Sequence, residues 1–291
     1  MSGLYGSGNN PGFNIFTDTL ADMKWPDIKR AAGNNAIVLL PIGVIEQHGP
    51  HLCLATDIYT AHIYCAEVKA LLEKKDYESV IAPPFFWGIC QSSKGFAGSF
   101  NIRPETAKAL LQDILTSLCG FGFKRIFGVN AHADVEHKII AVRAFSEVCE
   151  QSGIIACFPY EDFMLDNLGL TGNESCFYIT EPQILQTSKS EISDVHAGDV
   201  ETATINAFYP HLADTKTAQA LPGVPLGDNF EAWMFEGQLE RLSPQGYLGS
   251  PSSFESVDIN KHIKEHANRI SNAIIARINR DKENRTVDNN E

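Results

Sequence analysis

The sequence lacks the signals of a secreted or membrane protein. Its seven cysteines are scattered, odd in number and form no C-x-x-C pair, so neither a zinc knuckle nor a disulfide framework is indicated, and a reducing cytoplasm fits them best. No apolar run reaches the roughly 18–20 residues that a membrane span needs. The N-terminal stretch has neither the charged nor the apolar region of a signal peptide. We therefore expect a soluble cytoplasmic protein without a membrane partner.

Nucleotide-binding motifs and basic stretches are also missing. No G-x-G-x-x-G follows a predicted strand, and no G-x-x-x-x-G-K-[ST] occurs, which argues against dinucleotide and P-loop enzymes. Lys and Arg total 23 against 36 Asp and Glu, and the formal net charge is −13. Because nucleic-acid binding depends on Lys and Arg neutralising phosphates, nucleic acid is not expected as a partner.

The remaining composition is that of one globular domain. Hydrophobic residues make up 44% and charged residues 20% of the 291 residues, enough to bury a sizeable core. Residues 1–12 are rich in Gly, Asn and Ser, and residues 280–291 are polar and charged, so both ends are expected to fray. We predict a single α/β domain over residues 13–279, flanked by a flexible N-terminal segment and a polar C-terminal tail.

Short apolar runs alternate with helical patterns along the first half of the chain. Short buried strands separated by helices favour a mainly parallel sheet covered on both faces, a three-layer α/β/α fold. Two further helices are predicted after the alternating region. The expected strands are 36–43, 79–85, 124–130 and 153–160, and the expected helices are 58–73, one from Pro104, 135–151, 198–209 and 256–279.

Two pairs of acidic and imidazole side chains follow predicted strands. Glu46 and His48 come after the first strand, with Asp57 nine residues later, while His132 and Asp134 come after the third. Residues two apart in an extended segment point the same way, and ligands of parallel sheets collect beyond the carboxyl ends of strands. Zn²⁺ and Mn²⁺ accept such nitrogen and oxygen ligands. The alternative is a set of polar loop residues satisfied by backbone groups.

A third cluster lies in the segment DVHAGDVET at 194–202. His196 and Glu201 stand just before or within a predicted helix start. Taken alone, this segment could be a helix cap without chemistry. Together with the two earlier pairs, it is a candidate part of an active site.

The three motifs EQHGPHLCLATD (46–57), NAHAD (130–134) and HAGDVET (196–202) resemble the creatininase (creatinine amidohydrolase) family in order and spacing. The resemblance implies a mainly parallel α/β fold, a homo-oligomer that is often a hexamer, and two divalent ions per chain, Zn or Mn, with Fe also compatible. By the same resemblance, Glu46 and His132 would bind one ion, His48 the other, and Asp57 would bridge them. Asp134 stands where creatininase has a glutamate ligand.

The resemblance further implies hydrolysis of a small-molecule substrate. His196 and Glu201 match the family's downstream histidine and glutamate, so we expect His196 to pass a proton to the leaving nitrogen and Glu201 to set its tautomer or charge. The segment from Gly95 to Asn101 is a candidate lining of the site. His51 and His137 are expected to serve in packing or solvent contacts.

The substrate is expected to be a small, cyclic amide other than creatinine. By the same resemblance, creatininase itself is expected to have an aromatic residue between the ligands of the second motif and a tryptophan shortly before the downstream histidine. This chain has Ala133 and Ile192 at these places. The main hypothesis is cleavage of a non-peptide C–N bond by a metal-activated water. The alternatives are a family hydrolase that opens a cyclic, inosose-type ketone and a metal-binding or ligand-binding α/β protein without turnover.

Overall fold

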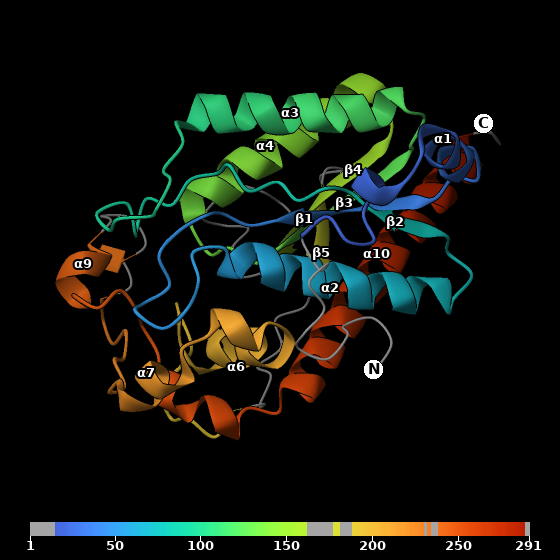
Figure 1. Ribbon diagram of the computed structural model, residues 1–291. Coiled ribbons are helices and arrows are strands. Elements are labelled where there is room, and N and C mark those ends of the chain that lie inside the picture. Colours follow the sequence, from blue (N-terminus) through green and yellow to red (C-terminus); the bar gives the residue numbers. More distant parts are fainter. Residues whose placement is uncertain (1–14, 162–176, 181–187, 230–231, 234–237, 289–291) are drawn as a thin grey trace.

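The computed structural model describes residues 15–161, 177–180, 188–229, 232–233 and 238–288 (Figure 1). Its centre is a parallel five-stranded sheet in the order β2-β1-β3-β4-β5. Such an order requires crossover connections, and helices supply most of them. The strands are β1 (Ile37–Ile42), β2 (Ser79–Ile81), β3 (Arg125–Asn130), β4 (Ile155–Glu161) and β5 (Phe177–Thr180).

Helices cover both faces of this sheet, which makes the three-layer α/β/α architecture that the sequence predicts (Figure 1). The alternation of side chains along β1 divides the core. Val38 and Leu40 pack in the cluster beneath α1, α3 and α4, and Ile37 and Leu39 pack in the cluster beneath α2 and α10. The helices are α1 (Trp25–Gly33), α2 (Thr56–Glu73), α3 (Pro104–Gly120), α4 (Val135–Ser152) and α10 (Ile259–Asp288).

Shorter elements fill the region between α2 and the later part of the chain. Of these, α6 contacts both α2 and α10, which brings residues near position 200 against the first half of the chain. These elements are η1 (Leu20–Asp22), α6 (Asp199–Phe208), η3 (Pro210–Leu212), α7 (Thr215–Ala220), α9 (Leu239–Leu242) and η4 (Pro251–Ser256). None of the described helices combines the length and the apolar character needed to cross a bilayer.

The predicted strands and helices are present, with shifts at their ends. The second strand stops at Ile81, not at 85, because the next residues include Pro83 and Pro84, which lack the amide hydrogens of a ladder. Helix α1 and strand β5 are additions. Residues 1–12 lie outside the described residues, whereas α10 continues to Asp288, into the segment expected to be a tail.

Candidate metal centre

The predicted ligands come together at the carboxyl edge of the sheet. Glu46 and His48 lie in the connection after β1, Asp57 is in the first turn of α2, and His132 follows β3. Each is at most 4% exposed to solvent. Burying four ionisable side chains is costly unless they compensate one another or bind an ion, so this cluster is the strongest candidate site of the described chain.

One group of donor atoms consists of Glu46, Asp57 and His132. The Nδ1 atom of His132 lies 3.1 Å from Oε1 of Glu46 and 3.0 Å from Oδ2 of Asp57. The three side chains each offer one donor atom, and these atoms lie within 4.8 Å of one another. Two carboxylates and one imidazole at this spacing can hold a divalent cation.

A second group consists of His48, Asp57 and Glu201. The Nε2 atom of His48 lies 3.1 Å from Oδ1 of Asp57 and 3.9 Å from Oε2 of Glu201. Their donor atoms also lie within 4.8 Å of one another. Asp57 therefore belongs to both of these groups and directs a different oxygen atom to each, while Glu46, His48 and His196 form a third such group.

Backbone carbonyls fix which nitrogen of each imidazole faces the groups. His48 directs Nδ1 to the carbonyl oxygen of Glu46 at 3.1 Å, and His132 directs Nε2 to that of Ile89 at 2.8 Å. A neutral imidazole that donates from one nitrogen presents a lone pair at the other. The remaining nitrogens, Nε2 of His48 and Nδ1 of His132, are the ones that face the carboxylates, an arrangement common behind metal-bound histidines.

The chemistry of these donors fits divalent ions such as Zn²⁺ or Mn²⁺. The buried Oδ2 atom of Asp57 makes no hydrogen bond with the described residues, although it lies 3.0 Å from Nδ1 of His132. A carboxylate oxygen and an imidazole nitrogen at this distance can bind the same divalent cation in place of a shared proton. The arrangement also leaves each group with more than one carboxylate, which suits a doubly charged ion.

The electrostatics of the cluster tie these side chains together. Burial opposes the positive charge of His48, but the carboxylates of Asp57 and Glu201 outweigh it and raise its pKa to about 10. Burial likewise opposes charge on His132, yet Glu46 and Asp57 raise its pKa well above the usual range. Burial raises the pKa of Glu201 to about 7, against the pull of His48. The carboxylates thus stabilise the protonated imidazoles, and the imidazolium charges stabilise the carboxylates. A cation that binds here must displace protons from the imidazoles.

Asp134 lies apart from both groups. It is the N-cap residue of α4, where its Oδ1 accepts the amide hydrogen of His137 at 3.0 Å. Its Oδ2 accepts the amide hydrogen of Gln91 at 2.8 Å. Both carboxylate oxygens are therefore engaged with the backbone, as expected of a helix cap. A direct ligand role for Asp134 stays a prediction, and Glu201 is the carboxylate that lies beside His48 and Asp57.

His196 completes the cluster from the other side. Its ring lies 4.5 Å from the ring of His48, centroid to centroid, and its Nδ1 lies 3.9 Å from Oε1 of Glu46. Burial and the nearby His48 lower its pKa to about 4, although Glu46 acts against them. The other nitrogen, Nε2, contacts Gln47, whereas Glu201 contacts Ala197 and His48. The expected control of the His196 tautomer by Glu201 stays a prediction.

The segment between β2 and α3 packs over the cluster and contributes residues that the sequence did not single out. The hydroxyl of Ser93, which is fully buried, donates to Oε2 of Glu46. Ser99, within the stretch predicted to line the site, accepts the amide hydrogen of Gln47 at 3.1 Å. Nothing in the local pattern marks Ser93, because its partner lies 47 positions away along the chain.

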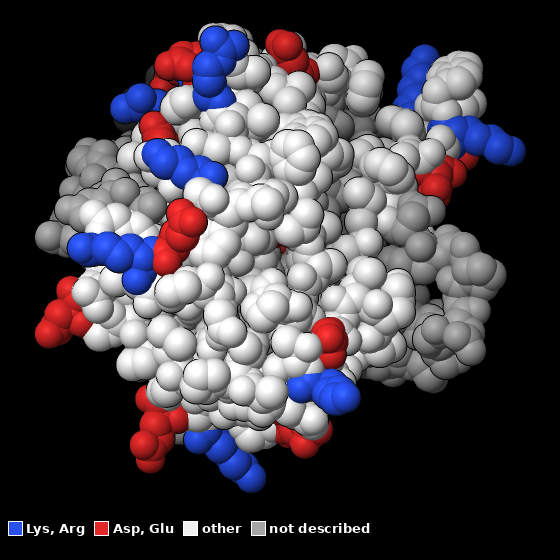
Figure 2. Space-filling model, turned by 60° about the vertical axis from the view of Figure 1, so that its left-hand side comes forward, with Lys and Arg blue, Asp and Glu red and all other residues white. Residues whose placement is uncertain are grey.

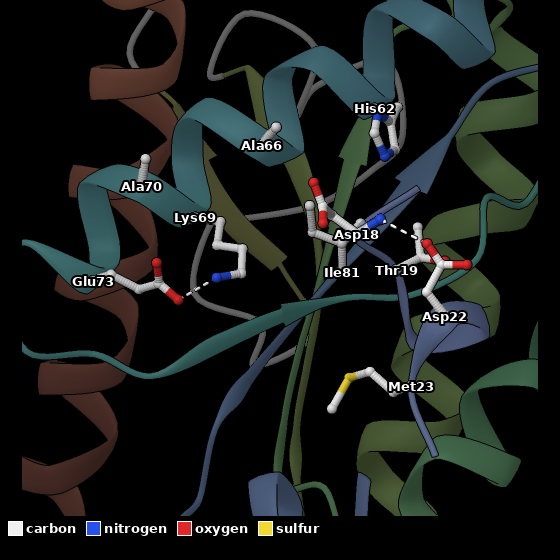
Figure 3. A pocket seen from close by; sticks show the side chains of 10 residues that line it. All are labelled: Asp18, Thr19, Asp22, Met23, His62, Ala66, Lys69, Ala70, Glu73 and Ile81. Atoms are coloured by element: carbon white, nitrogen blue, oxygen red, sulfur yellow. Dashed lines mark hydrogen bonds and ion pairs between the residues drawn. The ribbon is translucent and has the colours of Figure 1, made fainter. Parts of the chain in front are cut away.

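A separate cavity of about 420 Å³ lies at the β2 edge of the sheet, between α2 and the segment that precedes α1 (Figure 3). His62, Lys69 and Glu73 line it from α2, and Asp18 and Asp22 line it from the opposite side. Lys69 and Glu73 form an ion pair with each other. The lining residues include none of the buried cluster, so this cavity is distinct from the candidate metal centre.

The surface has a face whose centre carries almost no charged side chains, while lysines, arginines and acidic residues gather around its rim (Figure 2). Large apolar side chains are exposed on the segment that packs over the cluster and at Leu54. Leu54 is 39%, Trp87 is 38% and Phe100 is 50% exposed. The rings of Trp87 and Phe100 lie 5.6 Å apart in a T-shaped contact.

Known proteins with similar sequences carry two different activities in their names. A mycofactocin precursor peptide peptidase of Mycobacterium ulcerans (strain Agy99) is 26% identical over 226 residues, which is 76% of this chain and 77% of the relative. A creatinine amidohydrolase of Pseudomonas putida is 24% identical over 210 residues, which is 67% of this chain and 73% of the relative.

Solved structures and a family model agree on the fold. A crystal structure of creatinine amidohydrolase matches with a TM-score of 0.65 and 19% identity, covering 88% of this chain and 96% of the other. A creatinine amidohydrolase homologue from Bacteroides fragilis NCTC 9343 matches with a TM-score of 0.63 and 18% identity, over 90% of this chain and 96% of the other. The family model for creatininase, creatinine amidohydrolase, matches residues 21–274. The chain therefore belongs to the creatininase family.

Proposed function

We propose that this protein is a metal-dependent amidohydrolase with two divalent ions per chain. Glu46, Asp57 and His132 would hold one ion, and His48, Asp57 and Glu201 would hold the other. The observation that carries the proposal is the shared carboxylate of Asp57, whose two oxygens face two different imidazoles at 3.1 and 3.0 Å. A carboxylate between two donor groups is what a pair of neighbouring ions requires.

The chemistry follows from the charges that the cluster can hold. When bound, two close divalent ions lower the pKa of a water toward neutrality and polarise the carbonyl of a substrate amide. The remaining work falls to the protein. His196 directs Nδ1 toward the same space and can move a proton from the attacking water to the leaving nitrogen. Ser93 holds the Glu46 carboxylate in place through its hydroxyl.

The substrate we propose is a small amide, cyclic in its reacting part, whose C–N bond is cleaved. The relative from Pseudomonas putida is named for such a compound, creatinine, and the relative from Mycobacterium ulcerans is named for a precursor peptide. This chain has Ala133 beside the ligand His132 and Ile192 before His196, where the family resemblance leads us to expect aromatic residues. Smaller side chains at these two positions favour a substrate other than creatinine.

The test is metal content combined with a substrate panel. We expect two ions per chain, with Zn or Mn supporting activity, and hydrolysis that a chelator abolishes and added metal restores. The panel contains cyclic amides, linear amides, short peptides and a cyclic ketone. Turnover of only the ketone would favour the ring-opening alternative, and metal binding without turnover of any compound would favour a binding protein.

The matched variants for this test are Asp57→Asn and Asp18→Asn. Asp57→Asn should lose both ions and hydrolysis, because Asp57 belongs to both donor groups. Asp18 lines the separate cavity, so Asp18→Asn should keep both. An Asp57→Asn protein that retained two ions would overturn the assignment of the shared ligand.

We also propose that the protein is a homo-oligomer, which a hexamer would satisfy. Exposed Trp87 and Phe100 and the uncharged centre of the face in Figure 2 support this, because apolar area that stays exposed in a monomer is more stable when covered. Light scattering coupled to size-exclusion chromatography gives the mass directly. A mass of one chain at micromolar concentration would refute it.

A further inference from the structure

Gln47, the residue between Glu46 and His48, directs its side chain to His196. Two of its groups contact the same ring nitrogen: the main-chain carbonyl oxygen lies 2.9 Å and the side-chain amide Nε2 lies 3.0 Å from Nε2 of His196. One of these groups accepts a hydrogen and the other donates one. A single ring nitrogen cannot satisfy both at once, so the two contacts correspond to two positions of the ring proton.

The orientation of the Gln47 amide is fixed by its surroundings. Its Oε1 accepts the amide hydrogen of Gly49 at 2.9 Å, and reversing the amide would set two donors against each other. Gly246 lies against the same oxygen so closely that a Cβ there would come within 2.1 Å of it. The main-chain nitrogen of Gln47 donates to Ser99. Only 6% of Gln47 is exposed, so its amide nitrogen has little access to solvent and faces His196.

We propose that Gln47 is the positioning residue that holds His196 in either of its two neutral tautomers without moving the ring. With the proton on Nε2, the ring donates to the main-chain carbonyl of Gln47. With the proton on Nδ1, the ring accepts a hydrogen from the side-chain amide of Gln47. In both cases Nδ1 keeps its place 3.9 Å from Glu46.

The catalytic consequence rests on the proposed function. In the first tautomer Nδ1 has a free lone pair and can take a proton from the attacking water: an O–H bond breaks and an N–H bond forms. The imidazolium still donates to the Gln47 carbonyl, and Nδ1 then releases its proton to the leaving nitrogen of the amide. In the second tautomer Nδ1–H is a neutral hydrogen-bond donor that can stabilise the substrate oxygen, as neutral imidazoles do in other enzymes.

The experiment measures the tautomer directly. Histidine labelled with ¹⁵N is incorporated into the full-length protein, and the His196 signals are identified by their loss in His196→Asn. In the zinc-loaded and in the metal-free protein, we expect ring-nitrogen shifts for His196 that are averages of two tautomers. Gln47→Met keeps the main-chain carbonyl but removes the side-chain amide donor. In this variant the His196 ring-nitrogen shifts should move to those of the Nε2–H tautomer alone.

Two further variants control this measurement. Gln47→Glu replaces the donor by an acceptor, so it should also give the Nε2–H tautomer, and it serves if Gln47→Met fails to fold. Gln91→Met makes the same change at a glutamine whose side chain contacts Asn101, and its His196 signals should match those of the unaltered protein. A single Nε2–H tautomer in the unaltered protein, or identical signals in Gln47→Met, would overturn the proposal.

Kinetics supply the second readout. Both Gln47 variants should lower kcat by about 10–100-fold, the range for partners that orient a functional histidine, with KM and metal content unchanged. A loss of metal, or a change in KM alone, would assign Gln47 a structural role. If the unaltered protein shows no metal-dependent hydrolysis, the proposed function fails, and the tautomer measurement still decides whether Gln47 positions His196.

Discussion

Opposite effects on metal binding and stability are expected when Glu201 and Asp134 are each changed to the uncharged amide. In Glu201→Gln, the new carboxamide oxygen can still accept the amide hydrogen of Ala197, which Glu201 accepts at 2.5 Å, so the start of α6 should persist. The charge beside His48 and Asp57 is lost, and we expect the affinity for one ion to fall by more than about 100-fold, beyond the range for residues that only orient ligands. This equals about 2.7 kcal/mol.

Asp134→Asn should behave in the reverse way. Its carboxylate accepts amide hydrogens from His137 and Gln91, and an asparagine can replace only one of these acceptors. We expect a loss of about 1 kcal/mol in the free energy of unfolding, the usual cost of a weakened helix cap, with two ions still bound.

The assay counts ions and measures stability in the same samples. Metal content by mass spectrometry after gel filtration, with chelator competition for affinity, should give one ion for Glu201→Gln and two for Asp134→Asn. Urea unfolding measures the free energy. If Asp134→Asn lost an ion and Glu201→Gln kept both, the assignment of Glu201 as a ligand would be refuted and the predicted role of Asp134 restored.

Three other changes separate chemistry from stability. His196→Ala should lose hydrolysis by at least about 100-fold, the scale of general acid–base catalysis, while both ions stay bound; full turnover would remove its proton-transfer role. Gly246→Ala should lower both stability and kcat, because its backbone φ of +77° disfavours a side chain and a Cβ would collide with Gln47; unchanged melting would contradict this close contact. His262 is partly buried near Arg269, and burial and that positive charge lower its pKa to about 4. As the pH falls from 6.5 toward 4, the folded protein therefore takes up this proton later than the unfolded chain does. The stability that neutral His262 contributes is therefore present above pH 6.5 and is lost through this window, by about 2–3 kcal/mol. Between pH 7 and pH 5, the free energy of unfolding in urea should fall less for His262→Gln than for the unaltered protein. Equal falls would contradict the lowered pKa.

The sequence predicted most of the fold because its signals are local. Alternating apolar residues and buried runs mark β1, β3 and β4, and Pro104 marks the start of α3. Strand β5 escaped because four residues carry too short a pattern to be distinguished from a loop. Helix α1 has one local signal, Pro26 in its first turn, which alone does not distinguish a helix start from a turn.

The candidate site was predicted in its members more than in its arrangement. Order and spacing singled out Glu46, His48, Asp57 and His132, which do converge. They could not rank Asp134 against Glu201, since both stand at helix starts and only the packing of α6 against α2 brings one of them to His48. An aspartate directly before a helix is also a capping signature, and Asp134 does cap α4. Gln47 carried no signal, because its partner is 149 positions away.

The candidate metal centre is built from parts of the chain that lie far apart in the sequence. Its donor atoms come together only once the sheet has formed and α6 has packed against α2. They lie in the connection after β1, in the connection after β3 and in the first turn of α6. An unfolded chain presents no such set, so ions bound there would act on the folded state alone. They would add RT ln(1 + [ion]/Kd) to its stability, about 4 kcal/mol at a thousandfold excess over Kd. Metal supply would then govern how long the protein survives proteases as well as how fast it turns over.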